Sequence, residues 1–285
     1  MATWITHILS GLSFGMLLFL LASGLTLMFG LMKIVNLSQG AYYLLGAYIG
    51  FEVQRHTGSF LLAVLAAGAS ISVIGIIMER FLLRRLYNQP LPQVLLTIGF
   101  TFAIADISLY AWGARPVFIE SPTALTGGIR IGSIIFPFYR VFVIVVGALV
   151  AILLWLFQER TRVGMMVRAA VDDEEIAIGL GINVRSISVL VFAVGAFLAG
   201  LSGVLGGPLI GAYPGAELEV LLLALVVIIV GGRGSLLGAL VGSLFIGLID
   251  NFGKVFFPEF ALFTVFVPMA IVLYLKPSGL FISGD

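Results

Sequence analysis

The segment LTLMFGLMKIVNLSQGAYYLLGAYIG, residues 25–50, begins and ends as an apolar membrane helix but is polar at its centre. Lys33 supplies a charge there, and Asn36, Ser38 and Gln39 supply hydrogen-bonding side chains. Irregular backbone is tolerated at membrane depth only where protein buries it or where it lines water. The segment therefore predicts a membrane helix that breaks over residues 31–40, with polar side chains satisfying the freed backbone groups.

The composition of the whole chain is that of a polytopic membrane protein. Of its 285 residues, 61% are hydrophobic and 10% are charged, and the mean hydropathy is +1.19. Soluble domains carry about 25% charged residues. A net charge of +1 excludes a nucleic-acid surface, and the absence of cysteine excludes disulfides and thiolate sites. Two histidines cannot form a histidine-rich metal site, so we predict no metal ligands.

The apolar runs predict an all-α fold, a polytopic transmembrane helical bundle in a single domain over residues 1–285. A crossing needs about 20 apolar residues. We expect about eight or nine membrane segments, including broken or re-entrant half-helices. The first run is expected to be a retained span, because no basic segment of a secretory signal precedes it. The runs cover residues 5–29, 34–51, 60–78, 94–112, 141–157, 186–207, 220–250 and 260–275, the seventh being interrupted by GGRGS at 231–235.

Arginine-rich loops predict the orientation, because short cytoplasmic loops collect Lys and Arg. Residues 78–86 and 158–185 carry such clusters and should face the cytoplasm, with the intervening loop 113–140 outside. The side of the N-terminus stays open. It is external if residues 5–51 cross twice, and cytoplasmic if the broken segment dips in and returns.

Small residues recur at helical spacing in several runs, as in Gly46 with Gly50 and Gly238 with Gly242. Such pairs predict close helix packing inside lipid. LLGAYIG at 44–50 also echoes LLGALVG at 236–242, each after a polar, glycine-containing break. The echo is equally consistent with an internal repeat, which transporters often contain, and with chance.

The sequence contains no catalytic constellation and no GxxxxGK[ST] phosphate loop. Intramembrane carboxylates are few. Asp106 is expected to accept a hydrogen bond in helix packing, and Asp250 to reach an interface. No site residue is predicted to be catalytic.

The cytoplasmic loop 158–185 holds nine of the 29 charged side chains and predicts a short helix over residues 172–182. Asp172 is the expected N-cap, with Glu175 completing a capping box, and Asp173 and Glu174 add to an acidic first turn. Gly181 is expected to end the helix in the left-handed conformation. Ile176, Ala177 and Leu180 form an apolar stripe, which suits either the groove of another protein or the chain's own bundle.

Four motifs in order resemble the permease subunits of branched-chain amino acid (Liv-type) ABC importers, specifically the LivH-like one of the two. The departures, SQG at 38–40 and Gly179, lie in two of these motifs and leave the cargo unidentified. The motifs are GLTLMFGLMKIVNLSQGAYYLLGAYIG (24–50), GMMVRAAVDDEEIAIGLGINV (164–184), GGRGSLLGALVGSLFIGL (231–248) and KPSGLF (276–281).

The resemblance implies an inner-membrane permease that moves branched-chain or related amino acids, or similar small polar solutes. Its implied partners are a second, LivM-like permease subunit, two ATPase subunits and a periplasmic substrate-binding protein. ATP and magnesium would bind the ATPase subunits, so this chain is expected to need no cofactor and to be no enzyme. The implied coupling residues are Asp172, Asp173, Glu174, Glu175, Ala177 and Gly181.

The same resemblance places the helix break near the translocation path or its cytoplasmic mouth. The candidate path residues are Asn36, Ser38, Gln39, Gly40 and Tyr43. Lys33 is expected to extend to the cytoplasmic interface, with a pair to Asp250 as the alternative.

Two other functions remain as alternatives. A stand-alone secondary transporter or channel predicts buried titratable groups in several spans, and the sequence has almost none. A membrane scaffold leaves the capped cytoplasmic helix unexplained. Co-purification with an ATPase distinguishes all three.

Overall fold

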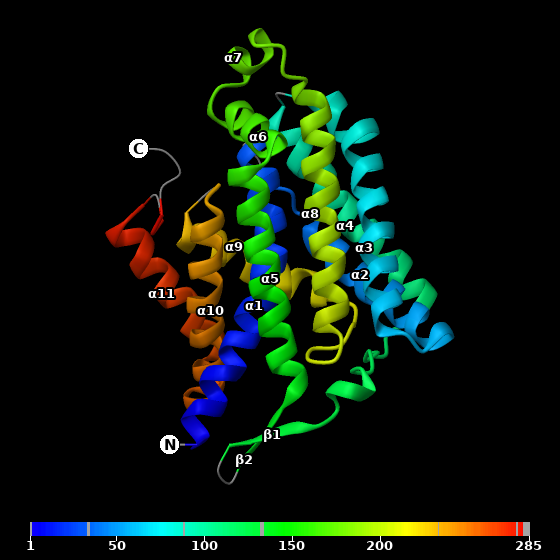
Figure 1. Cartoon of the computed structure of the whole chain (residues 1–285), viewed down its shortest axis with the longest axis vertical. Helices are drawn as coiled ribbons and strands as arrows, with labels where there is room; N and C mark the ends of the chain where they lie inside the picture. The colour runs from blue at the N-terminus through cyan, green and yellow to red at the C-terminus, as the bar shows by residue number, and fades with distance from the viewer. Residues whose placement is uncertain are drawn as a thin grey trace.

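The computed structural model describes residues 2–32, 35–87, 89–131, 134–232, 234–277 and 279–281 as a helical bundle (Figure 1). The predicted fold class is confirmed, and a two-stranded hairpin is added to it. The elements are α1 (Ala2–Met32), α2 (Gln39–Thr57), α3 (Phe60–Ile77), α4 (Pro90–Trp112), β1 (Gly128–Ile131), β2 (Ile134–Pro137), α5 (Phe138–Arg160), α6 (Arg162–Asp172), α7 (Glu174–Gly179), α8 (Val184–Gly206), α9 (Ala216–Gly231), α10 (Leu236–Phe256) and α11 (Ala261–Leu275).

Six helices are long and apolar enough to cross a membrane: α1, α3, α4, α5, α8 and α10. Within α11, Phe263–Leu275 is a shorter apolar helix, and α2 and α9 pack among these helices. After α3 the chain continues through a π-helical turn, Met78–Leu82, and a 3-10 turn, Leu83–Leu86. The long run 220–250 divides into α9 and α10 at the GGRGS break, as its length indicated.

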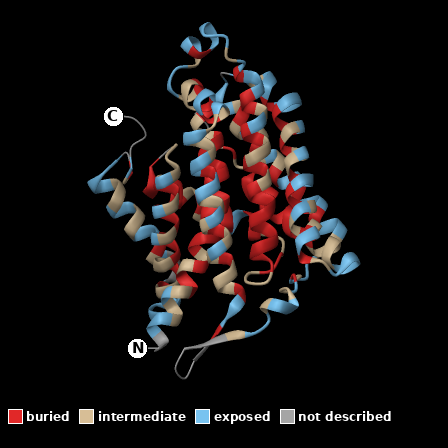
Figure 2. Cartoon of the chain, in the orientation of Figure 1, coloured by how far each residue is buried: buried red, intermediate tan, exposed pale blue. Residues whose placement is uncertain are grey.

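Buried residues gather at the centre of the bundle (Figure 2), and many large apolar side chains are exposed on its outside. In the apolar stretches of α1 and α8, 78% and 67% of the residues are buried. In those of α5 and α4, only 17% and 22% are buried. Glycine permits the closest helix approach. A Cβ built on Gly46 would lie 2.5 Å from the Gly200 Cα, and one on Gly247 would lie 2.5 Å from the Gly15 Cα. The small residues therefore pack helices against one another, as predicted.

The two ends of the bundle differ. The N-terminus and the β1–β2 hairpin lie at one end, and α6 and α7 at the other (Figure 1). Gln54, near the end of α2, exchanges two hydrogen bonds with the backbone of Glu120 in the loop that leads to the hairpin. Residues 5–51 therefore pass through the bundle twice. Of the two alternatives for the N-terminus, the structure therefore supports the first, in which it lies on the same side as the 113–140 loop.

The two similar segments, residues 44–50 and 236–242, lie at different positions along the long axis of the bundle. LLGAYIG lies within α2, whose first residue Gln39 donates to the Gly195 carbonyl halfway along α8. LLGALVG begins α10 beside Trp155, Glu159 and Asp172, at the end where α6 lies. Both segments follow a helix interruption, but they are not equivalent in position.

Candidate functional site

The segment between α5 and α8 extends beyond the bundle as an arm made of α6 and α7 (Figure 1). Thr161 caps α6 by accepting a hydrogen bond from the Gly164 amide at 3.0 Å. A Cβ on Gly164 would overlap the Phe157 and Gln158 carbonyl oxygens, so only glycine allows this turn. Arg168 bonds the Gln158 carbonyl and pairs with Glu159 at 2.9 Å, which holds α6 against the end of α5.

The cap of α7 lies one residue later than predicted. Asp172 ends α6, and Asp173 Oδ1 accepts from the Ile176 amide at 3.0 Å. The capping box of Asp172 and Glu175 is therefore wrong, because the chain between the two helices turns at Asp173. Gly181 does adopt the left-handed conformation, with φ of 84°, and the Ile182 amide bonds the Ala177 carbonyl. The predicted glycine termination is confirmed.

The apolar face of α7 is divided between solvent and the bundle. Ile176, Ile178 and Leu180 are 62%, 56% and 75% exposed, whereas Ala177 is 1% exposed. Of the two alternatives left open for this stripe, Ala177 follows the second, because its side chain packs into the chain's own hydrophobic core. The surface available to another protein is the three-residue tip Ile176, Ile178 and Leu180, which we call the apolar tip.

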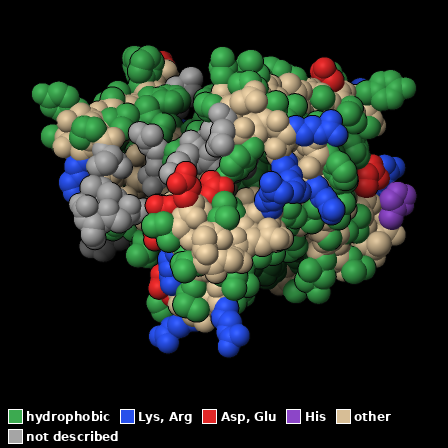
Figure 3. Space-filling model, turned by 90° about the horizontal axis from the view of Figure 1, so that it is seen from above, with side chains coloured by type: hydrophobic (Ala, Val, Ile, Leu, Met, Phe, Trp, Pro, Cys, Tyr) green, Lys and Arg blue, Asp and Glu red, His purple; other side chains and the backbone are tan. Residues whose placement is uncertain are grey.

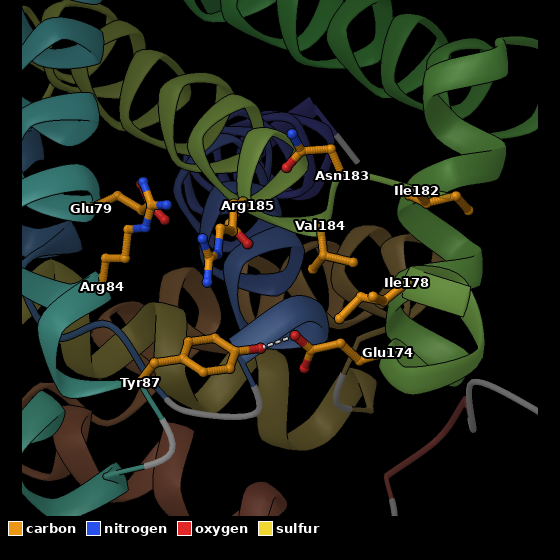
Figure 4. Close-up of a pocket in the computed structure, with 10 residues that line it drawn as sticks. Glu79, Arg84, Tyr87, Glu174, Ile178, Ile182, Asn183, Val184 and Arg185 are labelled. Atoms are coloured by element: carbon orange, nitrogen blue, oxygen red, sulfur yellow. Dashed lines mark hydrogen bonds between the residues drawn. The ribbon is translucent and has the colours of Figure 1, made fainter. Parts of the chain in front are cut away.

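A cavity of about 550 Å³ lies between the arm, the turn after α3 and the start of α8 (Figure 4). The Tyr87 hydroxyl donates a hydrogen bond to Glu174 Oε1 across it. Burial, followed by the bonded Glu174 carboxylate, raises the pKa of the Tyr87 phenol above its usual value. Tyr87 therefore remains a protonated donor at physiological pH and ties α7 to the turn after α3.

Charged side chains surround this contact on the same cavity wall (Figure 4). Glu79 is 4% exposed, and its Oε2 has no hydrogen-bond partner among the described residues. Arg84 and Arg185 extend from the turn after α3 and from the first turn of α8. Figure 3 looks down on this end and shows Lys and Arg side chains gathered beside acidic ones. The arm therefore lies beside charged side chains from the turn after α3 and from the start of α8.

A second connection runs from the arm into α8. Asn183 caps α8 by accepting from the Ser186 amide at 3.1 Å. Only Leu180, Gly181 and Ile182 separate the end of α7 from this cap. The apolar tip is therefore connected to α8 through the chain, and α7 is connected to the α3–α4 turn through Tyr87.

The helix break lies between α1, which ends at Met32, and α2, which begins at Gln39. The Asn36 side-chain oxygen accepts from the Ser38 amide at 3.1 Å and from its hydroxyl at 2.5 Å. Thr97 and Thr101 of α4 bond the amide and carbonyl of Leu37, at 3.3 and 3.1 Å. The prediction that polar side chains satisfy the broken backbone is confirmed for Asn36. Lys33 lies outside the described residues.

The five candidate path residues are buried in this chain. Asn36, Ser38, Gln39 and Tyr43 are at most 2% exposed, and Gly40 is also buried. A Cβ on Gly40 would overlap the Glu217 carbonyl oxygen at the start of α9. In this conformation the break is a packed joint between α1, α2, α4 and α9 rather than an open lining. Its contact with cargo stays a prediction.

Two intramembrane carboxylates behave differently from each other. Asp250 is 6% exposed and pairs with Lys254 at 2.6 Å, one helical turn away. Asp106 is exposed on α4 and has no hydrogen bond or ion pair to any described residue. The expectation that Asp106 serves helix packing is therefore wrong, because its side chain points away from the bundle.

Sequence reasoning missed Glu217, which is 4% exposed at the start of α9. Its Oε2 accepts from the Gly215 amide at 2.8 Å, and Gly215 has a φ of 103°. A signal was available in YPGAELE, residues 213–219, where a Pro-Gly turn precedes acidic residues in a first helical turn. Tyr87, Thr97 and Thr101 had no such signal, because their partners lie far away in sequence.

Comparison with known proteins gives a consistent result. A sequence model of the family described as the permease component of branched-chain amino acid transport systems matches residues 7–275. The high-affinity branched-chain amino acid transport system permease protein BraD of Pseudomonas aeruginosa is 30% identical, over 97% of this chain and 95% of its own. The corresponding protein LivH of Escherichia coli K12 is 26% identical over the same shares.

The fold also has a counterpart among solved structures. PsaBC from Streptococcus pneumoniae, solved in complex with Fab, superposes with a TM-score of 0.52 at 15% sequence identity. The match covers 94% of this chain and 91% of that chain. At this identity the likeness concerns the arrangement of helices alone.

Proposed function

Since this chain belongs to the family of branched-chain amino acid transport permease components, we propose that it is the membrane-spanning subunit through which an ABC importer moves branched-chain amino acids or related small amino acids. The observation that carries the proposal is the family match over residues 7–275, together with the 30% identity to BraD along nearly the whole chain. The multi-pass helical bundle places the protein in the cell membrane.

The proposed assembly contains two ATPase subunits, a substrate-binding protein and a second permease subunit. The second permease is proposed to be LivM-like, as the resemblance implies. The ATPase subunits bind ATP and magnesium and carry out hydrolysis, so this chain conducts cargo and is not itself an enzyme. The arm supports this division of labour, because it presents an apolar surface outside the membrane-spanning part of the chain.

We assign ATPase docking to the apolar tip. Three large aliphatic side chains exposed at one point suit insertion into an apolar groove of a partner. Glu174 and Asp173 support this surface without being part of it. Glu174 accepts a hydrogen bond from Tyr87, and Asp173 caps α7. Closure of the ATPase pair would push the tip, and the two connections described above would move α8 and the α3–α4 turn.

Reconstitution tests the proposal directly. The chain is co-expressed with the permease, ATPase and binding-protein genes beside it, and the purified complex is placed in proteoliposomes. Uptake of labelled leucine, isoleucine or valine should require both ATP and the binding protein, and should stop when the ATPase carries a hydrolysis-deficient substitution. Uptake by this chain alone with an ion gradient and without an ATPase would contradict the proposal.

A further inference from the structure

The outward face of α4 differs from the outward faces of its neighbours. Leu95, Gly99, Ala103, Asp106 and Tyr110 are all exposed, and their spacing of three or four residues places them on one side of the helix. The outward face of α5 is instead built of large apolar side chains, among them Val145, Leu149, Ile152 and Leu156. In the described residues, α4 alone combines a charge with exposed glycine and alanine in the middle of a span.

Asp106 lies inside the span of α4 rather than at either of its ends. It stands six residues before Trp112, the last residue of α4, which is about 9 Å at 1.5 Å per residue. Trp112 marks the outer end, because it bonds Glu52 and stacks on Tyr48 near the external loop. An aspartate side chain is far shorter than this distance. A carboxylate directed into lipid at that depth is strongly unfavourable, and intramembrane carboxylates face protein or water instead.

Among the residues that the structure describes, no side chain pairs with Asp106. The ion pairs of the described residues are His56–Glu52, Arg168–Glu159 and Lys254–Asp250, and none involves Asp106. α4 packs mainly on α2 and reaches the bundle only along its inner side. Gly99 has open space where a side chain would stand. The face therefore combines an uncompensated negative charge with room beside the helix.

We infer that the α4 face formed by Gly99, Ala103, Asp106 and Tyr110 lines a water-filled cargo path shared with the second permease subunit, and that the Asp106 carboxylate binds the ammonium group of the cargo in the outer half of the membrane. This inference rests on the proposed function, which supplies a zwitterionic cargo. An ammonium group complements an unpaired carboxylate, and the small residues on the cytoplasmic side of Asp106 leave space for the cargo to advance. Asp106 is thus a specificity-determining residue.

Thiol accessibility tests the placement without any transport measurement. The chain has no cysteine, so single replacements report cleanly. Asp106→Cys and Ala103→Cys are compared with Val145→Cys, which stands seven residues inside the outer end of α5 and is 58% exposed. In the assembled importer, a charged methanethiosulfonate should modify positions 103 and 106 at least tenfold faster than position 145. Equal, slow reaction at all three positions would overturn the inference.

Two further substitutions test the ammonium contact. Asp106→Asn should lower ATP-driven uptake at saturating binding protein at least tenfold, and Asp106→Glu should restore most of it. Loss of the second permease from Asp106→Asn during purification would instead make Asp106 an interface ion pair and overturn the cargo contact. Wild-type uptake by Asp106→Asn would overturn it too. Failure of the unsubstituted importer to move amino acids would refute the proposed function, whereas the labelling contrast would still decide where the α4 face lies.

Discussion

Tyr87 and Glu174, 87 positions apart in the chain, are joined by a hydrogen bond that links the arm to the turn between α3 and α4. Burial and the Glu174 carboxylate raise the pKa of the Tyr87 phenol, so the hydroxyl is protonated and can donate this hydrogen bond at physiological pH. It gives α7 a second attachment to the membrane helices besides its chain connection to α8. A push on the apolar tip is therefore expected to move two parts of the bundle together.

Removing this link should uncouple the arm from the α3–α4 turn. A hydrogen bond to a charged group contributes about 1.5–3 kcal/mol, and only this one contact is lost, so Tyr87→Phe should leave the membrane bundle folded. We expect cargo-stimulated ATP hydrolysis to fall several-fold while the ATPase still co-purifies. Tyr274→Phe, at an 87% exposed position on α11, is the matched control and should behave as wild type. Unchanged stimulation in Tyr87→Phe would show that the link transmits nothing.

The apolar tip should carry ATPase docking. Fully burying one aliphatic side chain is worth about 1.5–3 kcal/mol, so Leu180→Asp should weaken docking at least tenfold. Retention of the ATPase on the purified permease measures this. Met165→Ser on α6, where the parent side chain is 53% exposed, is a control outside the tip and should retain the ATPase. If Leu180→Asp retains it fully, docking belongs to another surface, with the turn at residues 78–87 as the next candidate.

The cap of α7 offers a comparison between adjacent aspartates. Asp173→Ala removes the hydrogen bond to the Ile176 amide and should destabilise α7 by about 0.5–2 kcal/mol. Asp172 is the last residue of α6 and does not cap α7, so Asp172→Ala should have little effect on α7. Amide hydrogen exchange of residues 174–180 measures the difference. Equal exchange in the two variants would contradict the capping geometry.

Gly40 should be required for folding as well as for transport. A Cβ on Gly40 would overlap the Glu217 backbone, and one on Gly46 would overlap the Gly200 backbone. Gly40→Ala should therefore cost about 1–3 kcal/mol through overpacking and lower accumulation in the membrane. Gly30→Ala is the control, since its added Cβ would meet Val171 at an ordinary 3.5 Å. Normal accumulation with lost transport in Gly40→Ala would instead show that Gly40 is needed for the cargo path and not for the fold.

Features that depend on neighbours in the chain were predictable. Apolar runs of about 20 residues indicated the bundle, and polar residues with glycines marked the break before α2 and the division between α9 and α10. Gly181 ends α7 as expected, because a left-handed residue is a local requirement. The arginine clusters separated the two ends of the molecule. Family membership followed from motifs spread along the whole chain.

The direction in which side chains point was decided by the tertiary structure. In a soluble helix a polar face reveals the outer side, but a membrane helix is apolar on all sides, so its pattern does not distinguish lipid from core. The outward position of Asp106 and the burial of Gln39 and Tyr43 therefore could not be read from spacing. The sequence by itself determined that the chain is a bundle of membrane helices and where those helices break. Packing between distant segments determined which residues face one another, because partners such as Tyr87 and Glu174, or Gly40 and Glu217, meet only once the bundle has closed.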